Sequence, residues 1–343
     1  MPEVVLGRTG LRVNKDGFGA LPVQRTGMEE AVVLLRKALD GGINFFDTAR
    51  AYTDSEEKLG AAISSRRNDF VLATKTQAQK GEDLWKDLET SLKNLKTDHI
   101  DIYQFHNPSG CPKPGDGTGL YEAALKAREQ GKIRFISITN HRLAIAREAV
   151  DSGLYDTLQF PFNYLSDEKE QALARLCEEK NMGFICMKAL SGGLITDVAA
   201  SRAWLMGFKG AVPIWGIQRE SELDALFAAQ RDNAVLSAEQ RRRIEADRAE
   251  LGGNFCRACD YCQPCPAEIQ ISTCARMFLL LRRMPPARFL TEDFKKEMAK
   301  IEDCIHCNHC KDNCPYGLDT PALLEKNLAD YREFLKPLKI GAF

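Results

Sequence analysis

Residues 41–75 read GGINFFDTARAYTDSEEKLGAAISSRRNDFVLATK. Two short apolar runs, Ile43–Asp47 and Phe70–Lys75, enclose the stretch SEEKLGAAISS, in which apolar residues recur with helical spacing. A strand, a helix and a second strand in this order predict two parallel strands joined by a right-handed crossover. This unit decides the fold because the chain repeats it up to about residue 230.

Six further strand-like runs alternate with helix-like segments on both sides of this unit. They are Gly17–Leu21, Ile100–His106, Arg134–Asn140, Thr157–Phe162, Gly183–Leu190 and Ala211–Ile217. Eight strand–helix repeats in about 220 residues are typical of a closed barrel. An open doubly wound sheet usually carries a glycine-rich turn after its first strand, and this sequence has none there. We therefore predict an α/β fold, a (β/α)₈ TIM barrel, followed by a small α-rich iron–sulfur domain.

Polar residues stand at or near the ends of several predicted strands, where barrels of this type place their active sites. They are Asp47, with Tyr52 on the loop that follows, and then Lys75, His106, Thr139, Asn140 and Gln159. Each residue taken alone has an ordinary structural explanation. On successive strands of one barrel, however, they predict a single convergent polar pocket.

The chemistry of this set is specific. A tyrosine hydroxyl has a pKa near 10, too high for efficient proton donation at neutral pH, and a nearby ammonium group lowers it. Lys75 could act on Tyr52 in this way, while Asp47 keeps the lysine charged. A neutral His106 could orient a carbonyl oxygen. The set predicts a site that gives a proton to an oxygen while hydride reaches the adjoining carbon.

Eight of the twelve cysteines lie in two blocks between Cys256 and Cys314, which indicates metal binding rather than disulfides. The second block, CIHCNHCKDNCP, has the spacing C-x₂-C-x₂-C-x₃-C-P of bacterial ferredoxins. The first, CRACDYCQPCP, is one residue shorter before its last cysteine. Zinc is the ordinary alternative for C-x₂-C pairs. Two four-cysteine runs that each close on Cys-Pro favour [4Fe–4S] clusters.

The stretches LGRTGLRV, GGINFFDTARAYTDSEEKLG, FVLATK, IDIYQFHN, GKIRFISITN and LQFPFNYL resemble the aldo-keto reductase family over about residues 4–230. The resemblance implies a catalytic tetrad with Tyr52 as general acid, together with Asp47, Lys75 and His106. It also implies a nicotinamide cofactor, NADP(H) or NAD(H), whose carboxamide is held by Thr139, Asn140 and Gln159.

The same resemblance places the cofactor phosphates near two segments, Lys188–Gly193 (including Gly192) and Gly216–Arg219 (including Gln218). The sequence departs from the family in three places. Met187 stands where many members have an aromatic ring, and WGIQRESEL replaces the usual adenine-phosphate motif. The long C-terminal substrate loop is replaced by the cysteine-rich segment.

The two cysteine blocks together resemble two-cluster ferredoxin domains over about residues 254–320. The resemblance implies one cluster on Cys256, Cys259, Cys262 and Cys314. It implies a second cluster on Cys304, Cys307, Cys310 and Cys265. The shortened spacer leaves Cys274 open as an alternative to Cys265.

The sequence also predicts domain boundaries and the class of partner. We predict a barrel over residues 1–235, a linker helix over 236–253 that ends at Gly252 and Gly253, a ferredoxin-type domain over 254–320 and a C-terminal helix over 321–343. A net charge of −1 gives no case for nucleic acid or anionic membrane as a partner. The sequence shows neither a signal peptide nor an apolar run long enough to span a membrane, so we expect a cytoplasmic protein.

The predicted function is a carbonyl/alcohol oxidoreductase whose clusters exchange electrons with an external carrier such as ferredoxin. Nicotinamide moves two electrons as hydride, whereas each cluster moves one. Three explanations are open: an unseen flavin, a substrate that tolerates radical steps, or clusters uncoupled from the barrel chemistry. The alternatives are an NAD(P)H-dependent carbonyl reductase with structural clusters and a non-catalytic redox sensor or electron carrier.

Overall fold

The computed structural model describes residues 2–231, 235–251, 255–283 and 286–336. They form two compact units, one running to Ala189 and resuming over Asp197–Ile244, the other made of Leu190–Thr196 and the chain from Glu245 onward. The predicted break at Gly252 and Gly253 and the end of the predicted tail helix lie outside the described residues.

The first unit is a closed barrel of parallel strands in the order β10-β3-β4-β5-β6-β7-β8-β9, which confirms the predicted (β/α)₈ fold. The strands are short and almost wholly buried, as apolar runs covered by helices on the outside should be. They are β3 (Gly17–Gly19), β4 (Phe45–Asp47), β5 (Val71–Thr76), β6 (Ile100–His106), β7 (Ile133–Thr139), β8 (Thr157–Pro161), β9 (Gly183–Met187) and β10 (Ala211–Gly216).

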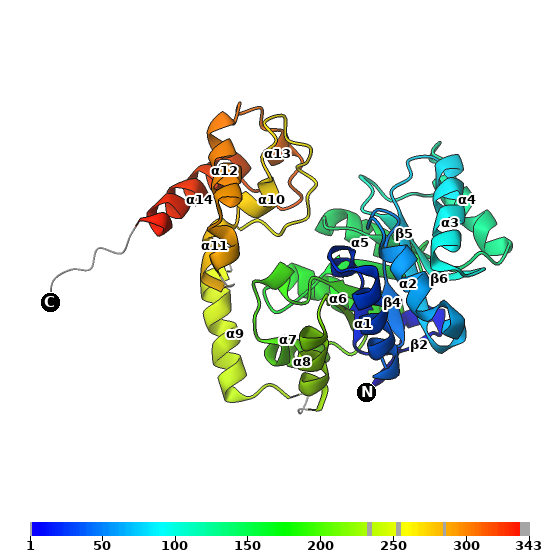
Figure 1. Cartoon of the computed structure of the whole chain (residues 1–343). Coiled ribbons are helices and arrows are strands. Elements are labelled where there is room, and N and C mark those ends of the chain that lie inside the picture. Colours follow the sequence, from blue (N-terminus) through cyan, green and yellow to red (C-terminus); the bar gives the residue numbers. More distant parts are fainter. Residues whose placement is uncertain (1, 232–234, 252–254, 284–285, 337–343) are drawn as a thin grey trace. The chain divides into compact units, whose positions relative to one another are not determined.

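Amphipathic helices follow the strands one by one and surround the barrel (Figure 1). They bury an alanine- and leucine-rich face and expose charged residues. They are α1 (Met28–Asp40), α2 (Ser55–Ile63), α3 (Gly81–Leu95), α4 (Leu120–Glu129), α5 (Leu143–Ser152), α6 (Glu168–Glu179), α7 (Val198–Met206) and α8 (Glu220–Arg231).

A short antiparallel hairpin, which the sequence analysis did not predict, precedes the barrel. Its strands are β1 (Glu3–Val5) and β2 (Arg12–Asn14). Leu6, Leu11 and Val13 of this segment share one buried cluster with residues from the barrel interior, including Phe45. Three-residue strands are too short to show a periodic pattern, so their contribution is visible only in the packing.

The second unit consists of short helices separated by long loops. The charged helix α9 (Ala238–Leu251) leads into it, and α10 (Ile271–Cys274), α11 (Met277–Arg283), α12 (Glu292–Ala299) and α13 (His309–Asp312) follow. All four pack against the last helix, α14 (Thr320–Leu335). The buried Asn327 of α14 receives the Phe278 N–H and donates to the Ala275 carbonyl, which ties α14 to the start of α11. Across the described residues, no helix has the length and apolar composition needed to span a membrane.

Candidate active site and cluster site

A buried ion pair occupies the end of the barrel where the strands finish. Lys75 Nζ on β5 donates to Asp47 Oδ2 on β4 at 2.6 Å and to the Thr48 carbonyl oxygen at 2.6 Å. Two amides from other strands complete the surroundings of the carboxylate: Gln104 Nε2 donates to Oδ1 at 2.9 Å and Gln159 Nε2 to Oδ2 at 3.4 Å. The carboxylate is therefore oriented by donors from three different strands.

Burial and pairing act in opposite directions on this pair. Burial raises the pKa of Asp47 and lowers that of Lys75, while the opposite charge of the partner counteracts both shifts. A direct contact of 2.6 Å, with the Gln104 amide also donating to the carboxylate, favours the charged state. Removing either partner would leave a buried, uncompensated charge.

Tyr52 lies on the loop after β4, next to this pair. Its ring meets the His106 ring edge-on with 5.8 Å between centroids, and Lys75 Nζ is 5.0 Å from the Tyr52 centroid. Burial raises the pKa of Tyr52 and the charge of Asp47 adds to the effect. The predicted lowering by Lys75 is not seen, since burial and Asp47 set the direction of the shift, and the ammonium group itself is bound to Asp47 and Thr48. Tyr52 thus keeps its proton at neutral pH.

His106 ends β6 and is neutral at physiological pH. Burial, with a smaller contribution from Lys75, lowers its pKa to about 3. Among the described residues, its Nδ1 is one of the buried side-chain atoms that lack a hydrogen-bond partner. A neutral imidazole beside a protonated tyrosine is suited to orient the oxygen of a substrate.

The predicted carboxamide contacts differ in how much of their hydrogen-bonding capacity is free. Gln159 Oε1 is buried and has no partner among the described residues, so it can accept an N–H from a carboxamide. Asn140, by contrast, donates to the Pro108 carbonyl at 2.9 Å and accepts the Arg142 N–H at 2.8 Å. Asn140 thus shapes the loop after β7. Thr139, the last residue of β7, is buried beside them.

The first predicted phosphate segment has an unusual backbone. Lys188 has a positive φ of 59°, and Ser191, Gly192 and Gly193 follow with 49°, 67° and 93°. Consecutive left-handed residues turn backbone N–H groups toward one side and form anion-binding concavities. Met187, just before this segment, is partly buried against the barrel interior. A turn of this kind is compatible with the phosphate role that the sequence predicts for the segment.

The second phosphate segment is less distinctive. Gly216 ends β10 and is exposed, and the Gln218 N–H donates to Glu222 Oε2 at 2.9 Å. Arg219 is exposed and 3.9 Å from Glu222 at the start of α8. A solvated pair of this kind contributes little energy and leaves the guanidinium group accessible.

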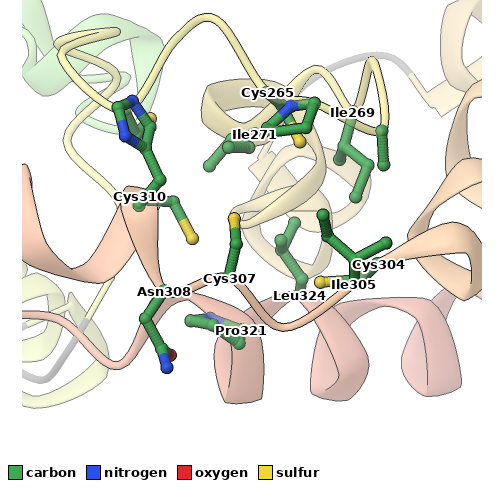
Figure 2. A pocket seen from close by; sticks show the side chains of 14 residues that line it. Cys265, Ile269, Ile271, Cys304, Ile305, Cys307, Asn308, Cys310, Pro321 and Leu324 are labelled. Carbon is green, nitrogen blue, oxygen red and sulfur yellow. The ribbon is translucent and has the colours of Figure 1, made fainter.

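The second cysteine block surrounds a pocket in the C-terminal unit. Cys304, Cys307 and Cys310 line it together with Cys265 and Cys262 of the first block, and the four labelled cysteines surround one hollow in Figure 2. Cys274 does not line this pocket: its thiol is fully buried, 4.0 Å from the Glu297 carbonyl oxygen. This arrangement favours Cys265 over Cys274.

The two C-x₂-C-x₂-C loops share a backbone pattern. Ala258 and Asp260 have positive φ in the first loop, and His306 and Asn308 have it at the equivalent positions of the second. In each loop these left-handed residues stand on either side of the middle cysteine. This backbone conformation turns N–H groups inward. The same backbone pattern therefore occurs in both cysteine loops.

The remaining predicted ligands belong to the first block and the end of the second. Burial and the neighbouring Cys256 and Cys259 raise the pKa of Cys262 to about 12, so these three thiols influence one another. Cys314 follows α13 and is partly buried. Within the described residues, no three Cys, His, Asp or Glu groups converge on a point that would suit one metal ion.

Comparison with known proteins identifies both units. A model of the aldo/keto reductase family matches residues 16–203, more than half of the chain. The chain belongs to the aldo/keto reductase family. A model of a 4Fe–4S dicluster domain matches residues 255–319, which confirms the predicted iron–sulfur module. The protein is thus an oxidoreductase of the aldo/keto reductase type with a 4Fe–4S domain.

Individual relatives match the barrel. L-galactose dehydrogenase from Arabidopsis thaliana is 32% identical over 211 residues, which cover 56% of this chain and 66% of that protein. Methylglyoxal reductase DkgB from Salmonella typhi is 35% identical over 242 residues, 63% of this chain and 86% of that protein. The holo form of aldo-keto reductase AKR11C1 from Bacillus halodurans shares the fold, with a TM-score of 0.62 at 21% identity over 72% of this chain and 96% of its own. The chain spans about two thirds of the length of the first of these relatives.

Sequence reasoning missed three residues of the barrel site. Gln104 orients Asp47, and it stands two residues before His106, so strand alternation could have placed it on the same face. Thr48 contributes only its carbonyl oxygen, for which no sequence signal exists. His141 is buried, and its pKa is lowered by burial and by the nearby Lys188 and His106.

Proposed function

We propose that this protein interconverts a small carbonyl compound and its alcohol with NADP(H) or NAD(H). Two [4Fe–4S] clusters would relay electrons to or from an external ferredoxin-type carrier. The observation that carries the proposal is the buried Asp47–Lys75 pair beside Tyr52 and His106. A barrel that only bound nicotinamide would have no need of this costly pair. Reduced thiolates suit the cytoplasm, where we place the protein.

The residues of the barrel site supply the proton chemistry. A bound nicotinamide would supply hydride to the carbonyl carbon. Tyr52 gives its hydroxyl proton to the carbonyl oxygen, and the neutral His106 orients that oxygen. Lys75, held by Asp47, keeps a positive charge next to the Tyr52 ring. Gln159 Oε1, assisted by Thr139 and Asn140, holds the carboxamide, and Lys188–Gly193 and Gly216–Arg219 hold the phosphates. Alcohol oxidation runs through the same groups in reverse.

The two clusters would be held by two sets of four cysteines. One set is Cys256, Cys259, Cys262 and Cys314, and the other is Cys304, Cys307, Cys310 and Cys265. The pocket lined by Cys265 supports the second set, and the repeated left-handed turns support two sites. Two adjacent clusters can together hold the two electrons of a hydride, with a flavin or a radical step to separate them.

An anaerobic stopped-flow experiment separates the candidate functions. NADPH is mixed with the full-length protein, with and without a carbonyl substrate, and the visible absorption of the clusters is followed. We expect NADPH to bleach the clusters. Carbonyl reduction without bleaching would support an ordinary reductase with structural clusters. NADPH binding without turnover would support a sensor or carrier. Mass spectrometry of the released cofactors tests for a flavin.

A cluster variant tests the relay itself. Cys307→Ser removes a ligand of the second set, far in sequence from every proposed catalytic residue. Barrel integrity is checked by NADPH binding. We expect binding to survive and turnover with a reduced ferredoxin-type carrier to fail. Unchanged turnover after loss of that cluster would contradict the relay.

A further inference from the structure

The loop between β9 and α7 belongs to the C-terminal unit. In sequence it joins two elements of the barrel, yet Leu190–Thr196 groups with the chain from Glu245 onward. Two arginines of that unit donate to its backbone. Arg276 Nη1 reaches the Gly192 carbonyl oxygen at 3.2 Å, and Arg283 Nη1 reaches the Leu194 carbonyl oxygen at 3.0 Å.

Arg283 is fixed by more than this contact. Its side chain is 7% exposed and pairs with Asp247 at 3.0 Å and with Glu250 at 2.5 Å, both on α9. The planar guanidinium group donates in a rigid fork, so two carboxylates on one side fix the direction of the remaining N–H groups. The Leu194 carbonyl therefore meets a donor whose position is set by α9 and α11.

The loop needs such support because its backbone is unfavourable on its own. Ser191 is left-handed without being glycine, and it precedes two left-handed glycines. Conformations of this kind persist only where the surroundings enforce them. A Cβ atom added at Gly192 would meet Arg276 Nη1 at 3.0 Å, so the guanidinium group also lies directly against the loop.

Arg276 is close in sequence to α10, a helix that contacts the proposed cluster ligand Cys256. It follows α10, and its N–H donates to the Thr273 carbonyl at 3.3 Å. The Ser272 carbonyl oxygen on the same helix is 3.9 Å from Cys256 Sγ. Because metal-binding segments gain their structure together with the metal, the position of α10 depends on this cysteine loop.

We propose that Arg276 and Arg283 are positioning residues that hold Leu190–Thr196 in the shape that binds the nicotinamide phosphates. Cofactor affinity would then depend on the segment that carries the two arginines and on the Cys256 loop next to α10, even when no electron passes through either cluster. The proposal rests on the proposed function, which assigns a cofactor phosphate to Lys188–Gly193.

Three full-length variants test the proposal. Arg276→Ala removes one donor. Arg283→Lys keeps a positive charge for Asp247 and Glu250 but loses the fork that reaches Leu194. The control, Arg282→Ala, removes the neighbouring arginine of α11, which pairs with Asp330 on α14 instead. The readouts are amide hydrogen exchange of the peptide containing residues 188–196, the Kd for NADPH, and iron content.

We expect Arg276→Ala and Arg283→Lys each to speed loop exchange and raise the Kd for NADPH by about tenfold, with iron content unchanged. The control should stay within about twofold of the wild type. Unchanged amide hydrogen exchange of residues 188–196 in both test variants would overturn the proposed positioning role of the two arginines. Faster exchange with an unchanged Kd would overturn its role in cofactor binding. A wild-type protein that does not bind NADPH or NADH would contradict the proposed function. Amide hydrogen exchange would still show whether the two arginines hold the loop.

Discussion

Asp47 in the barrel accepts from Lys75, Gln104 and Gln159, so side chains of the chain itself fix the geometry of the proposed active site. The cysteine-rich unit differs, since its thiols surround a pocket and its loops are shaped by left-handed turns rather than by side-chain pairs. The barrel site is thus preorganised by protein donors, whereas the cluster site is completed by the group it binds. Changes to the barrel site should therefore affect rates, and changes to the cysteines of the second unit should affect cluster content.

The largest effect should come from Tyr52→Phe. Removing the Tyr52 hydroxyl, whose ring lies next to Lys75 and His106, should lower kcat for carbonyl reduction by about 10²–10⁴-fold, the usual contribution of general acid catalysis. The Kd for NADPH should change little, because the ring remains. Steady-state kinetics and fluorescence titration measure the two quantities. A variant with wild-type kcat would remove Tyr52 from the role of proton donor.

Gln104→Leu should have a smaller effect on the same site. It removes the amide that donates to Asp47 Oδ1 and leaves that oxygen buried without this partner. A hydrogen bond to a charged group contributes about 1.5–3 kcal/mol, so we expect kcat to fall by about tenfold or more. The matched control is Gln159→Leu, whose contact to Asp47 is longer, at 3.4 Å. If Gln159→Leu lowered kcat more with no change in cofactor affinity, the assignment of these two amides would be reversed.

In the second unit, Cys265→Ser and Cys274→Ser should differ in iron content. Anaerobic wild-type protein should hold about eight irons, the content of two [4Fe–4S] clusters. Cys265→Ser should reduce this number to about four, because it removes a thiol that lines the pocket of the second block. Cys274→Ser should leave it unchanged. The opposite result would make Cys274 the eighth ligand, and stoichiometric zinc in the wild type would contradict both clusters.

The sequence predicted the barrel well because its strands and helices carry strong periodic patterns. It also placed Asp47 and His106 at the ends of their strands, where the structure has them, but it did not show which side chains bind one another. The raised pKa of Tyr52 depends on its burial and on the nearby charge of Asp47, which no spacing of residues reveals. The grouping of Leu190–Thr196 with the second unit was equally invisible, because it depends on arginines more than 80 positions away in sequence.

The smallest effect concerns pH. The pKa of His106 is lowered from 6.5 to about 3 in the folded protein, so between these values the unfolded chain binds a proton that the folded chain does not. The contribution of His106 to the free energy of unfolding is therefore fully present above about pH 6.5 and is lost as the pH falls toward 3. The loss cannot exceed about 1.4 kcal/mol per pH unit, because a single proton is involved, and partial exposure of the ring reduces it further. Thermal unfolding of the wild type and of His106→Gln, which cannot titrate, isolates the contribution between pH 7.5 and 5. The wild type should lose Tm relative to the variant as the pH falls, and clusters damaged by acid should affect both proteins alike. A constant difference in Tm would mean that His106 titrates normally, and the barrel site would then be more open to water than its buried ion pair indicates.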